Sequence, residues 1–439
     1  MKKVNINKSV SGSLTRRDFV RTSATAAALG VVTIPALANV RSGGRSDTLK
    51  IGLIGCGGRG TGAAAQALAA DPDVVLHAMG DAFDDQLQSS LKRLKKSSNV
   101  NRIDVPEARQ FSGFDAYKQV IDSGVDVVLL ATTPVFRPIH LEYAISKDKH
   151  VFCEKPVAID APGIRKVLEL AEEAERRDLR LMSGFCWRYS LPQLATYKKI
   201  HDGAIGEIRA METTYQAGPL TDVPRQAGWS DMEWQLRNWK AFTWLSGDHI
   251  VEQAIHAIDW ISWAMQGEMP VRVSGNGGRQ CRSGEWTGNM YDHFSMCYEF
   301  ADGQRAFHLC RQIANTPFNN NAYFMGTEGY CRSNPWTPEC VIENNGHEIW
   351  RYEGDNNDMY QTEHNELFAA IRSGRKLNEG VAMAHSTMMG IMGRMCAYSG
   401  QSLTWDQCIN STESFAPAEW AWGDVPFPSV AKPGITPFV

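Results

Sequence analysis

The chain has 439 residues, of which 43% are hydrophobic, and 45 basic against 49 acidic side chains give it a formal net charge of −4. A chain of this length can bury one or two hydrophobic cores. Its near-neutral charge gives no electrostatic reason to expect a nucleic acid or an anionic membrane surface as a partner.

The first 38 residues are predicted to be a twin-arginine signal peptide. The pattern Thr15-Arg16-Arg17-Asp18-Phe19-Val20 is followed by the apolar stretch TSATAAALGVVTIPALA, which ends in the cleavage signal Ala36-Leu37-Ala38. The apolar stretch is too short and too rich in Ala and Thr to anchor the mature protein in a membrane. We therefore expect a periplasmic protein, exported in folded form by the twin-arginine machinery, a route that suits proteins that load a cofactor in the cytoplasm. Residues 39–47 form a polar linker.

Residues 48–186 are predicted to form a Rossmann domain with a doubly wound parallel sheet. Apolar, β-branched runs alternate here with helical stretches, as in RPIHLEYAISKDK and PGIRKVLELAEEAERRD. Such runs indicate parallel strands that are covered on both faces. The strands are expected in the segments 49–54, 74–81, 125–133, 150–156 and 180–189.

Residues 187–439 are predicted to form an α+β domain for substrate binding and oligomerisation. Longer strands with partial alternation, such as RAFHLCRQI, are separated by Gly- and Asn-rich turns, which favours a large, mostly antiparallel sheet with one covered face. A helix around residues 249–259 and a late helical region are expected beside it. The tail 416–439 is rich in Pro and Trp and is expected to be an extended strap or an interface segment.

A G-x-G-x-x-G pattern, Gly55 to Gly60, follows the first strand and opens a helix. Gly55 suits the tight turn, Gly57 allows the backbone to approach a pyrophosphate, and Gly60 allows the helix to pack on the strand. The anion would then lie at the helix N-terminus. Asp81 ends the next strand, where it would accept hydrogen bonds from the adenosine ribose and repel a 2′-phosphate. This favours NAD over NADP as the cofactor.

Ionisable side chains interrupt the apolar stretch HIVEQAIHAID, residues 249–259. Glu252, His256 and Asp259 are spaced by four and three residues, so one continuous helix would carry them on a single face. Buried carboxylates and imidazoles are unfavourable unless they are paired or functional. A satisfied core histidine with two surface acids is one alternative. A zinc site that adds His249 is another, but no recognised metalloenzyme pattern is present and we predict no metal.

The sequence Glu154-Lys155-Pro156 ends a predicted strand, where ligands bind in open α/β sheets. Together with the glycine pattern, Thr132-Thr133-Pro134 with His140, Gly206-Glu207-Ile208, Gly326-Thr327-Glu328-Gly329 and the stretch 249–259, it makes residues 48–405 resemble the Gfo/Idh/MocA sugar oxidoreductases.

The resemblance implies a catalytic pair, Lys155 and His256, with Glu252 where the family usually has Asp. Oxidation of an alcohol requires a base within hydrogen-bond reach of its hydroxyl, and a histidine titrates near neutrality. Lys155 would polarise the oxygen, and Glu252 would orient imidazole or substrate. The expected cofactor-binding residues are Gly55, Gly57, Gly58, Arg59, Gly60, Asp81, Thr132, Thr133, Pro134, His140 and Glu154.

Tryptophans at 229, 234, 239 and 244 recur every five residues, which does not correspond to one helical face. They are candidates for stacking on a sugar, and a packing or subunit-interface role is the alternative. The expected substrate contacts are Arg188, Tyr215, Trp239, Asp259 and Tyr291.

The predicted function is an NAD(P)-dependent oxidoreductase that transfers hydride between a sugar or glycoside hydroxyl and a tightly bound nicotinamide. One alternative is a redox-neutral glycosidase similar to glycoside hydrolase family 109, although the chain lacks that family's Gly-rich segment in place of EQAIHAIDW. Another is a non-catalytic sugar- or NAD-binding protein. A homo-oligomer is expected. The ten cysteines are expected to be mostly reduced, with one disulfide left open among Cys281, Cys297, Cys310, Cys331 and Cys340.

Overall fold

The computed structural model describes residues 48–337, 339–417 and 419–439, which fall within one compact unit. The predicted signal peptide and linker, residues 1–38 and 39–47, lie outside the described residues. Within the described residues, no helix combines the length and the apolar character that a membrane crossing would require.

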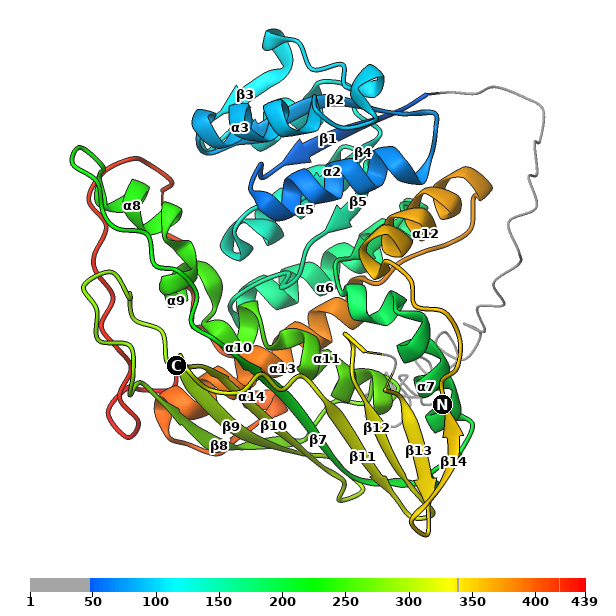
Figure 1. The fold of residues 1–439 in the computed structure, drawn as a ribbon. Helices are drawn as coiled ribbons and strands as arrows, with labels where there is room; N and C mark the ends of the chain where they lie inside the picture. The colour runs from blue at the N-terminus through cyan, green and yellow to red at the C-terminus, as the bar shows by residue number, and fades with distance from the viewer. Residues whose placement is uncertain (1–47, 338, 418) are drawn as a thin grey trace, which may run out of the picture. The chain divides into compact units, whose positions relative to one another are not determined.

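The first sheet has six strands, all parallel, in the order β3-β2-β1-β4-β5-β6 (Figure 1). The strands are β1 (Leu49–Ile54), β2 (Val74–Asp81), β3 (Gln110–Ser112), β4 (Val127–Leu130), β5 (His150–Cys153) and β6 (Leu181–Ser183). All four residues of β4 are buried, because helices cover both faces of the sheet. This confirms the predicted doubly wound Rossmann domain.

Two layers of helices cover this sheet. The helices of the domain are α2 (Gly58–Ala70), α3 (Asp84–Leu94), α4 (Ala116–Asp122), α5 (Arg137–Ser146) and α6 (Ala161–Arg176), with 3₁₀ turns at Val100–Arg102, Glu107–Arg109 and Pro134–Phe136. Side chains of α2 and α3 share a core with one face of the sheet, and those of α4, α5 and α6 share a core with the other. In α6, Ile164, Val167 and Ala171 are buried at helical spacing, which is the apolar stripe that a covering helix needs.

The second sheet has nine strands in the order β14-β13-β12-β11-β7-β10-β9-β8-β15, and only β7 and β10 pair in parallel. The strands are β7 (Ile208–Ala217), β8 (Arg272–Gly278), β9 (His293–Glu299), β10 (Arg305–Gln312), β11 (Ala322–Gly326), β12 (Tyr330–Ser333), β13 (Val341–Asn344), β14 (His347–Arg351) and β15 (Leu403–Thr404). Buried and exposed side chains alternate along β10, as expected for a sheet with one covered face. The predicted α+β domain is confirmed.

Helices cover one face of the large sheet, with α11 packed on β7 and α13 on β8. The helices of this domain are α7 (Leu191–His201), α8 (Asp231–Arg237), α9 (Thr243–Ser246), α10 (His249–Glu252), α11 (Ile255–Ala264), α12 (Met359–Ser373), α13 (Gly380–Ser399) and α14 (Trp405–Ile409), with 3₁₀ turns at Cys186–Tyr189 and Trp239–Ala241.

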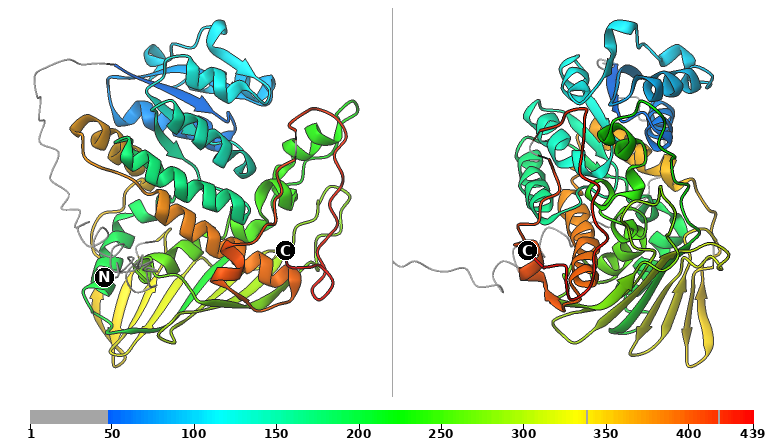
Figure 2. Two further views of the ribbon diagram at one scale, coloured as in Figure 1. Left: turned by 180° about the vertical axis from the view of Figure 1, so that it is seen from behind. Right: turned by 90° about the vertical axis from the view of Figure 1, so that its left-hand side faces the viewer.

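Two segments of the second domain return to the Rossmann domain. Leu367 and Phe368 of α12 join the core that α2 forms with the first sheet. The tail beyond α14 runs beside α8, where the Met232 N–H donates to the Gly423 carbonyl over 3.0 Å (Figure 2). The ring of Trp422 lies 4.5 Å from that of Phe114 in the Rossmann domain. The tail is therefore an extended strap that connects both domains.

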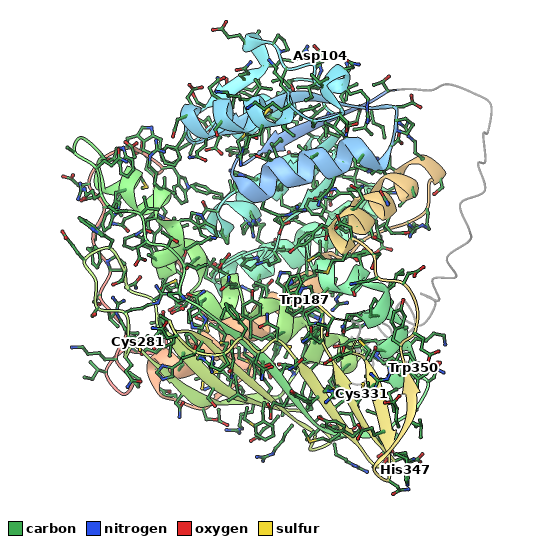
Figure 3. The ribbon with its side chains drawn as sticks, viewed as in Figure 1. Asp104, Trp187, Cys281, Cys331, His347 and Trp350 are labelled. Carbon is green, nitrogen blue, oxygen red and sulfur yellow. The ribbon has the colours of Figure 1, made fainter. Side chains whose placement is uncertain are left out.

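All ten cysteines are free thiols, and eight of them are buried. Figure 3 shows Cys281 and Cys331 far apart in the second domain. The single disulfide that the sequence left open is absent from the described residues.

Candidate active site

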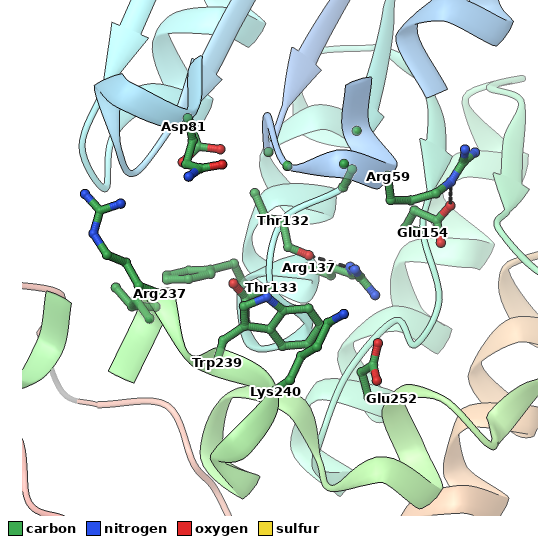
Figure 4. A pocket seen from close by; sticks show the side chains of 18 of the residues that line it. Arg59, Asp81, Thr132, Thr133, Arg137, Glu154, Arg237, Trp239, Lys240 and Glu252 are labelled. Carbon is green, nitrogen blue, oxygen red and sulfur yellow. Dashed lines mark hydrogen bonds and ion pairs between the residues drawn. The ribbon is translucent and has the colours of Figure 1, made fainter. Parts of the chain in front are cut away.

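A cavity of about 960 Å³ lies at the carboxyl ends of the first sheet's strands, where parallel sheets bind ligands. Both domains contribute to its walls (Figure 4). Most of the predicted site residues line it, namely Gly55, Gly57, Gly58, Arg59, Gly60, Asp81, Thr132, Thr133, Glu154, Lys155, Tyr215, Trp239, Glu252 and His256.

The glycine turn between β1 and α2 forms one end of the cavity. Gly55 has a φ of +95°, and a Cβ added there would lie 2.5 Å from the Ala131 backbone carbon. A Cβ at Gly60 would lie 1.8 Å from the Gly55 carbonyl oxygen. At Gly57 and Gly58, by contrast, a Cβ would meet nothing within 4 Å. Gly55 and Gly60 thus shape the turn. Gly57 and Gly58 leave open space at the N-terminus of α2, which fits a dinucleotide pyrophosphate.

Asp81 ends β2 beside this turn. Its Oδ2 accepts from the Cys56 N–H over 2.5 Å, and its Oδ1 accepts from the Phe83 N–H over 2.9 Å. Burial raises the pKa of the Asp81 carboxyl, and these two backbone donors oppose that effect. Each oxygen keeps a further acceptor position, so the carboxylate can also bind two ribose hydroxyls.

Arg237 closes the same end of the cavity from the second domain. Its Nη1 and Nη2 donate to the two Asp85 oxygens over 3.0 Å each, and its guanidinium carbon lies 4.0 Å from the centre of the Phe83 ring. A bidentate pair of this kind fixes orientation as well as distance. Arg237 thus lies at the nucleotide end of the cavity.

Arg59 is held by acidic partners around the start of α2. Its Nε pairs with the Glu154 carboxylate (Figure 4). Its Nη2 lies 3.1 Å from Oε1 of Glu363 in α12. Its guanidinium carbon also lies 5.1 Å from the centre of the Tyr360 ring. Burial raises the pKa of Glu363 well above its ordinary value. Arg59 and Glu154 therefore line the cavity as a neutralised pair that ties α12 to the Rossmann domain.

Lys155 and His256 both line the other end of the cavity. Lys155 follows β5, and its Nζ donates to the Glu252 carbonyl over 2.5 Å. The His256 ring stacks on Trp187 with a centroid separation of 4.8 Å. Burial lowers the pKa of Lys155, and burial together with the Lys155 charge lowers the pKa of His256 well below its ordinary value. At neutral pH the imidazole is therefore uncharged and able to accept a proton.

The segment that carries Glu252, His256 and Asp259 is not one helix. α10 ends at Glu252 and α11 begins at Ile255, so the prediction of a single helical face was wrong. A continuous helix would engage the Glu252 carbonyl at the His256 N–H, but that carbonyl instead accepts from Lys155. The break in the helix thus provides the acceptor that positions the lysine.

Five predicted site residues do not line the cavity. Arg188 donates from Nε and Nη2 to Asp259 over 2.8 and 2.7 Å, and Ser386 donates to the same carboxylate. Tyr291 donates its hydroxyl to the Ala431 carbonyl over 3.1 Å. These three side chains are engaged in packing the second domain.

The remaining two follow β4. Pro134 begins a 3₁₀ turn, and His140 lies in α5. His140 stacks on Tyr117 at 4.1 Å, and burial lowers its pKa to about 3. The Nδ1 of His140 lies 3.3 Å from the Thr132 hydroxyl. Thr132 itself lines the cavity, so His140 acts on the site through this neighbour.

The alternative zinc site does not form around His249. Its ring lies 5.0 Å from that of Phe294 and outside the cavity walls, and neither ring nitrogen has a hydrogen-bond partner. Within residues 48–337, 339–417 and 419–439, no group of three or more His, Cys, Asp or Glu side chains could hold a metal ion.

The tryptophan series divides into two classes. Trp234 and Trp244 are buried in a core cluster, where their indole N–H groups donate to Val223 and Gln235. Trp229 and Trp239 line the cavity. The alternative of a packing role therefore describes the first two.

Several residues of the cavity wall were not identified from the sequence. Arg137 is buried and donates to the carbonyls of Pro156 and Thr132 over 2.5 and 2.7 Å, so it braces two strand-end loops. Gln253 lies between α10 and α11, and Tyr360 and Trp336 come from distant segments. Their positions depend on tertiary packing, and no local motif marks them.

Two family models match the chain and together cover more than half of it. Residues 49–185 match an oxidoreductase family model with an NAD-binding Rossmann fold, and residues 194–332 match a GFO/IDH/MocA C-terminal domain. Inositol 2-dehydrogenase from Rhizobium meliloti (strain 1021) is 24% identical over 352 residues, which are 76% of this chain and 93% of that protein.

A second relative, 2,7-anhydro-N-acetylneuraminate hydratase from Escherichia coli (strain K12), is 30% identical over 182 residues. That match spans 42% of this chain and 44% of the hydratase. A solved structure of aldose-aldose oxidoreductase from Caulobacter crescentus, complexed with glycerol, has a similar fold, with a TM-score of 0.64 at 19% identity. It covers 81% of this chain and 99% of that one.

Proposed function

The chain belongs to the Gfo/Idh/MocA family of oxidoreductases with an NAD-binding Rossmann domain, and from this premise we propose that it transfers hydride between a sugar or glycoside hydroxyl and a tightly bound NAD. The observation that carries the proposal is one cavity that holds both the open glycine turn at Gly57 and Gly58 and the pair Lys155 and His256.

The residues present fit the chemistry of alcohol oxidation. When bound, the nicotinamide accepts hydride from the alcohol carbon or returns it to a carbonyl carbon. His256 is uncharged and can take the hydroxyl proton. Lys155, oriented by the Glu252 carbonyl, places an ammonium group where negative charge develops on the oxygen. The Glu252 carboxylate lines the same cavity and can accept from a neighbouring hydroxyl (Figure 4).

The cavity wall supports a carbohydrate as the substrate. Trp239, Trp336 and Tyr215 present aromatic rings, and Lys240 and Glu252 present polar groups. Apolar surfaces with a few polar groups of this kind can bind the C–H faces and the hydroxyls of a sugar ring. The relative named an inositol 2-dehydrogenase is consistent with a polyol substrate.

The nucleotide end supports NAD rather than NADP. Asp81 and Asp85 both line it, and the nearby cation, Arg237, is engaged by Asp85 and Glu233. A 2′-phosphate would therefore meet uncompensated negative charge.

Export to the periplasm is part of the same proposal and is supported by the pattern at residues 15–38. A protein in that compartment must hold its nucleotide firmly and regenerate it within the site. Arg16→Lys combined with Arg17→Lys should leave the protein in the cytoplasm, and unchanged secretion would contradict the proposal.

We also propose a homo-oligomer. The face of the large sheet opposite its helices exposes Phe307 and Met325, which are 41% and 37% accessible. A second copy of the chain could cover this face, and light scattering of the purified protein would detect it.

Incubation of the purified protein with a carbohydrate panel tests the function. The panel contains glucose, myo-inositol, methyl glucosides, cellobiose and nitrophenyl glycosides, and the assay follows reduced nicotinamide, keto-sugar and released aglycone. Keto-sugar formed with matching nicotinamide reduction, or with reduction of a second sugar, supports the proposal. Aglycone release without net reduction would instead establish the redox-neutral glycosidase, and binding without any turnover would establish a non-catalytic protein.

A further inference from the structure

Gln253 stands directly after Glu252 and lines the cavity, but the proposed chemistry does not use it. Its Oε1 accepts a hydrogen bond from Nε2 of Gln312, at the end of β10, over 2.5 Å. Its own Nε2 has no hydrogen-bond partner within the described residues. The direction in which this amide points follows from the groups behind it.

The first of these groups is Arg282, which can only donate hydrogen bonds. Its Nη2 donates to Oε1 of Gln312. Asp292 holds the loop that carries Arg282, because its Oδ2 accepts from the backbone N–H groups of Gln280 and Cys281 over 2.7 and 2.5 Å. Asp292 and Gln312 are at most 1% exposed. Arg282 thus forms a fixed donor behind the cavity wall.

The fixed donor determines the orientation of both amides. The oxygen of Gln312 must face Arg282, so its NH₂ group faces Gln253. Gln253 must then present its oxygen to Gln312, and its NH₂ group is left for the cavity. The relay Arg282–Gln312–Gln253 therefore converts a buried positive charge into a hydrogen-bond donor with one defined position on the cavity wall.

The groups next to this donor are complementary to it. Glu252 presents a carboxylate, which can only accept, and Lys155 presents an ammonium, which can only donate (Figure 4 shows Glu252). Neighbouring hydroxyls of a sugar can satisfy all three groups, because each hydroxyl both donates and accepts.

We propose that Gln253 is a specificity-determining residue, which donates from Nε2 to one sugar oxygen beside the reacting carbon, and that Gln312 is the positioning residue that sets its direction. The proposal rests on the proposed function for the class of substrate. A site built to hydrogen-bond a hydroxyl rejects an analogue that lacks it. The preferred ligands are therefore sugars with an oxygen, rather than hydrogen or an ammonium group, at that position.

Two variants test the relay by different means. Gln253→Met removes the donor at similar volume. Gln312→Glu leaves the cavity wall untouched, but a carboxylate at position 312 cannot donate. The Gln253 amide must then turn its NH₂ group toward this carboxylate, and its oxygen then faces the cavity. Folding should be preserved in Gln312→Glu, because Arg282 then faces a carboxylate. Gln216→Glu is the matched control, since Gln216 also accepts from an arginine, Arg311, but lies outside the cavity.

The measurement, made by tryptophan fluorescence, is the affinity for the best ligand of the carbohydrate panel and for its analogues in which one hydroxyl is replaced by hydrogen or by an amino group. The wild-type protein and Gln216→Glu should discriminate against one deoxy analogue by about 10- to 100-fold, as for a lost partner of a buried polar group. Gln253→Met should lose that discrimination at that position alone. Gln312→Glu should instead shift its preference at that position toward the amino analogue, because the turned amide presents an oxygen that accepts from the ammonium group. The double variant should behave like Gln253→Met alone, because Gln312 acts only through Gln253.

A Gln312→Glu variant that preferred the hydroxyl over the amino analogue as strongly as the wild-type protein does would overturn the relay, and so would additive losses in the double variant. Binding with the expected discrimination but without turnover would contradict the proposed oxidoreductase activity and leave the relay supported. If the wild-type protein bound no carbohydrate of the panel, both proposals would fall.

Discussion

The two ends of the cavity are built differently. The nucleotide end consists mainly of backbone from one continuous stretch, Gly55–Gly60, with Asp81 from the next strand, and Arg237 closes it from the second domain. The substrate end consists of side chains from separate elements, with Lys155 after β5, His256 in α11 and Trp336 after β12. A site made of backbone is encoded locally, whereas a site made of converging side chains depends on the packing of both domains. Substitutions at the two ends should therefore fail in different ways.

The largest effect is expected at the substrate end. His256→Asn and Lys155→Met should each lower kcat by about 10²- to 10⁴-fold, the range for loss of a positioned acid or base. The amount of bound nucleotide should stay at the wild-type level, because neither side chain belongs to the glycine turn. Steady-state rates and nucleotide content measured together test this. His249→Asn alters a buried histidine outside the cavity and is the control. A parallel loss of nucleotide would show that the two ends are not independent.

The Arg188–Asp259 pair should matter for stability rather than for chemistry. Asp259 is 1% exposed and accepts both hydrogen bonds of the guanidinium. Asp259→Leu leaves the arginine uncompensated and should lower the free energy of unfolding by about 3–5 kcal/mol, as when one partner of a buried pair is removed. Urea denaturation measures this, and Arg188→Met in the same chain should recover most of the loss. A fall in kcat at unchanged stability would instead place Asp259 at the substrate.

A smaller effect is expected at the glycine turn, where two neighbouring substitutions should differ. Gly57→Ala meets no protein atom within 4 Å and should leave the fold intact, but its methyl group occupies the space next to the helix N-terminus. It should weaken nucleotide binding by about 1–3 kcal/mol, within the usual range for one substitution. Gly60→Ala would place its Cβ 1.8 Å from the Gly55 carbonyl oxygen and should impair folding itself. Calorimetric titration with NAD and thermal unfolding separate the two results, and equal behaviour of both variants would be evidence against the open turn.

The pH dependence is the most graded effect. The pKa of His256 is lowered from 6.5, so the imidazole stays unprotonated as the pH falls, and kcat/KM should decline only well below that value. The pKa of Lys155 is lowered from 10.5, so its ammonium group loses its proton at a pH below 10.5. As the pH rises through that pKa, kcat/KM should decline a second time. A rate profile of the wild-type protein, repeated with Lys155→Met to remove the alkaline limb, tests both directions. An acidic limb at or above pH 6.5 would mean that His256 is not the base.

The same contrast explains what could be predicted from the sequence. The strand Val74–Asp81 was predicted with its observed bounds, and the glycine turn occupies its expected place, because periodicity and glycine spacing are local signals. The short strands β11 to β15 were not specified, since two to five residues carry little periodicity and their pairing depends on distant partners.

The substrate end was predictable only in part. Lys155, Glu252 and His256 line the cavity, and their catalytic roles stay a prediction. The break between α10 and α11 was missed because nothing in EQAIHAID marks it: no Gly or Pro interrupts the run, and the break is stabilised from outside by Lys155. Gln253 was missed for a related reason, since its role follows from Gln312, 59 residues away along the chain, and from Arg282, which donates to Gln312.

The convergence of Lys155 and His256 beside a bound nicotinamide is tested most directly by the nucleotide that co-purifies with the protein. Its mass and its near-ultraviolet absorbance should be recorded before and after addition of the best sugar of the panel. We expect one equivalent of NAD per chain, and an absorbance of reduced nicotinamide that rises at once in the wild-type protein but at least a hundredfold more slowly in His256→Asn and Lys155→Met, within the range of about 10²–10⁴ for such groups. A purified protein without nucleotide, or reduction at the wild-type rate in both variants, would contradict this arrangement.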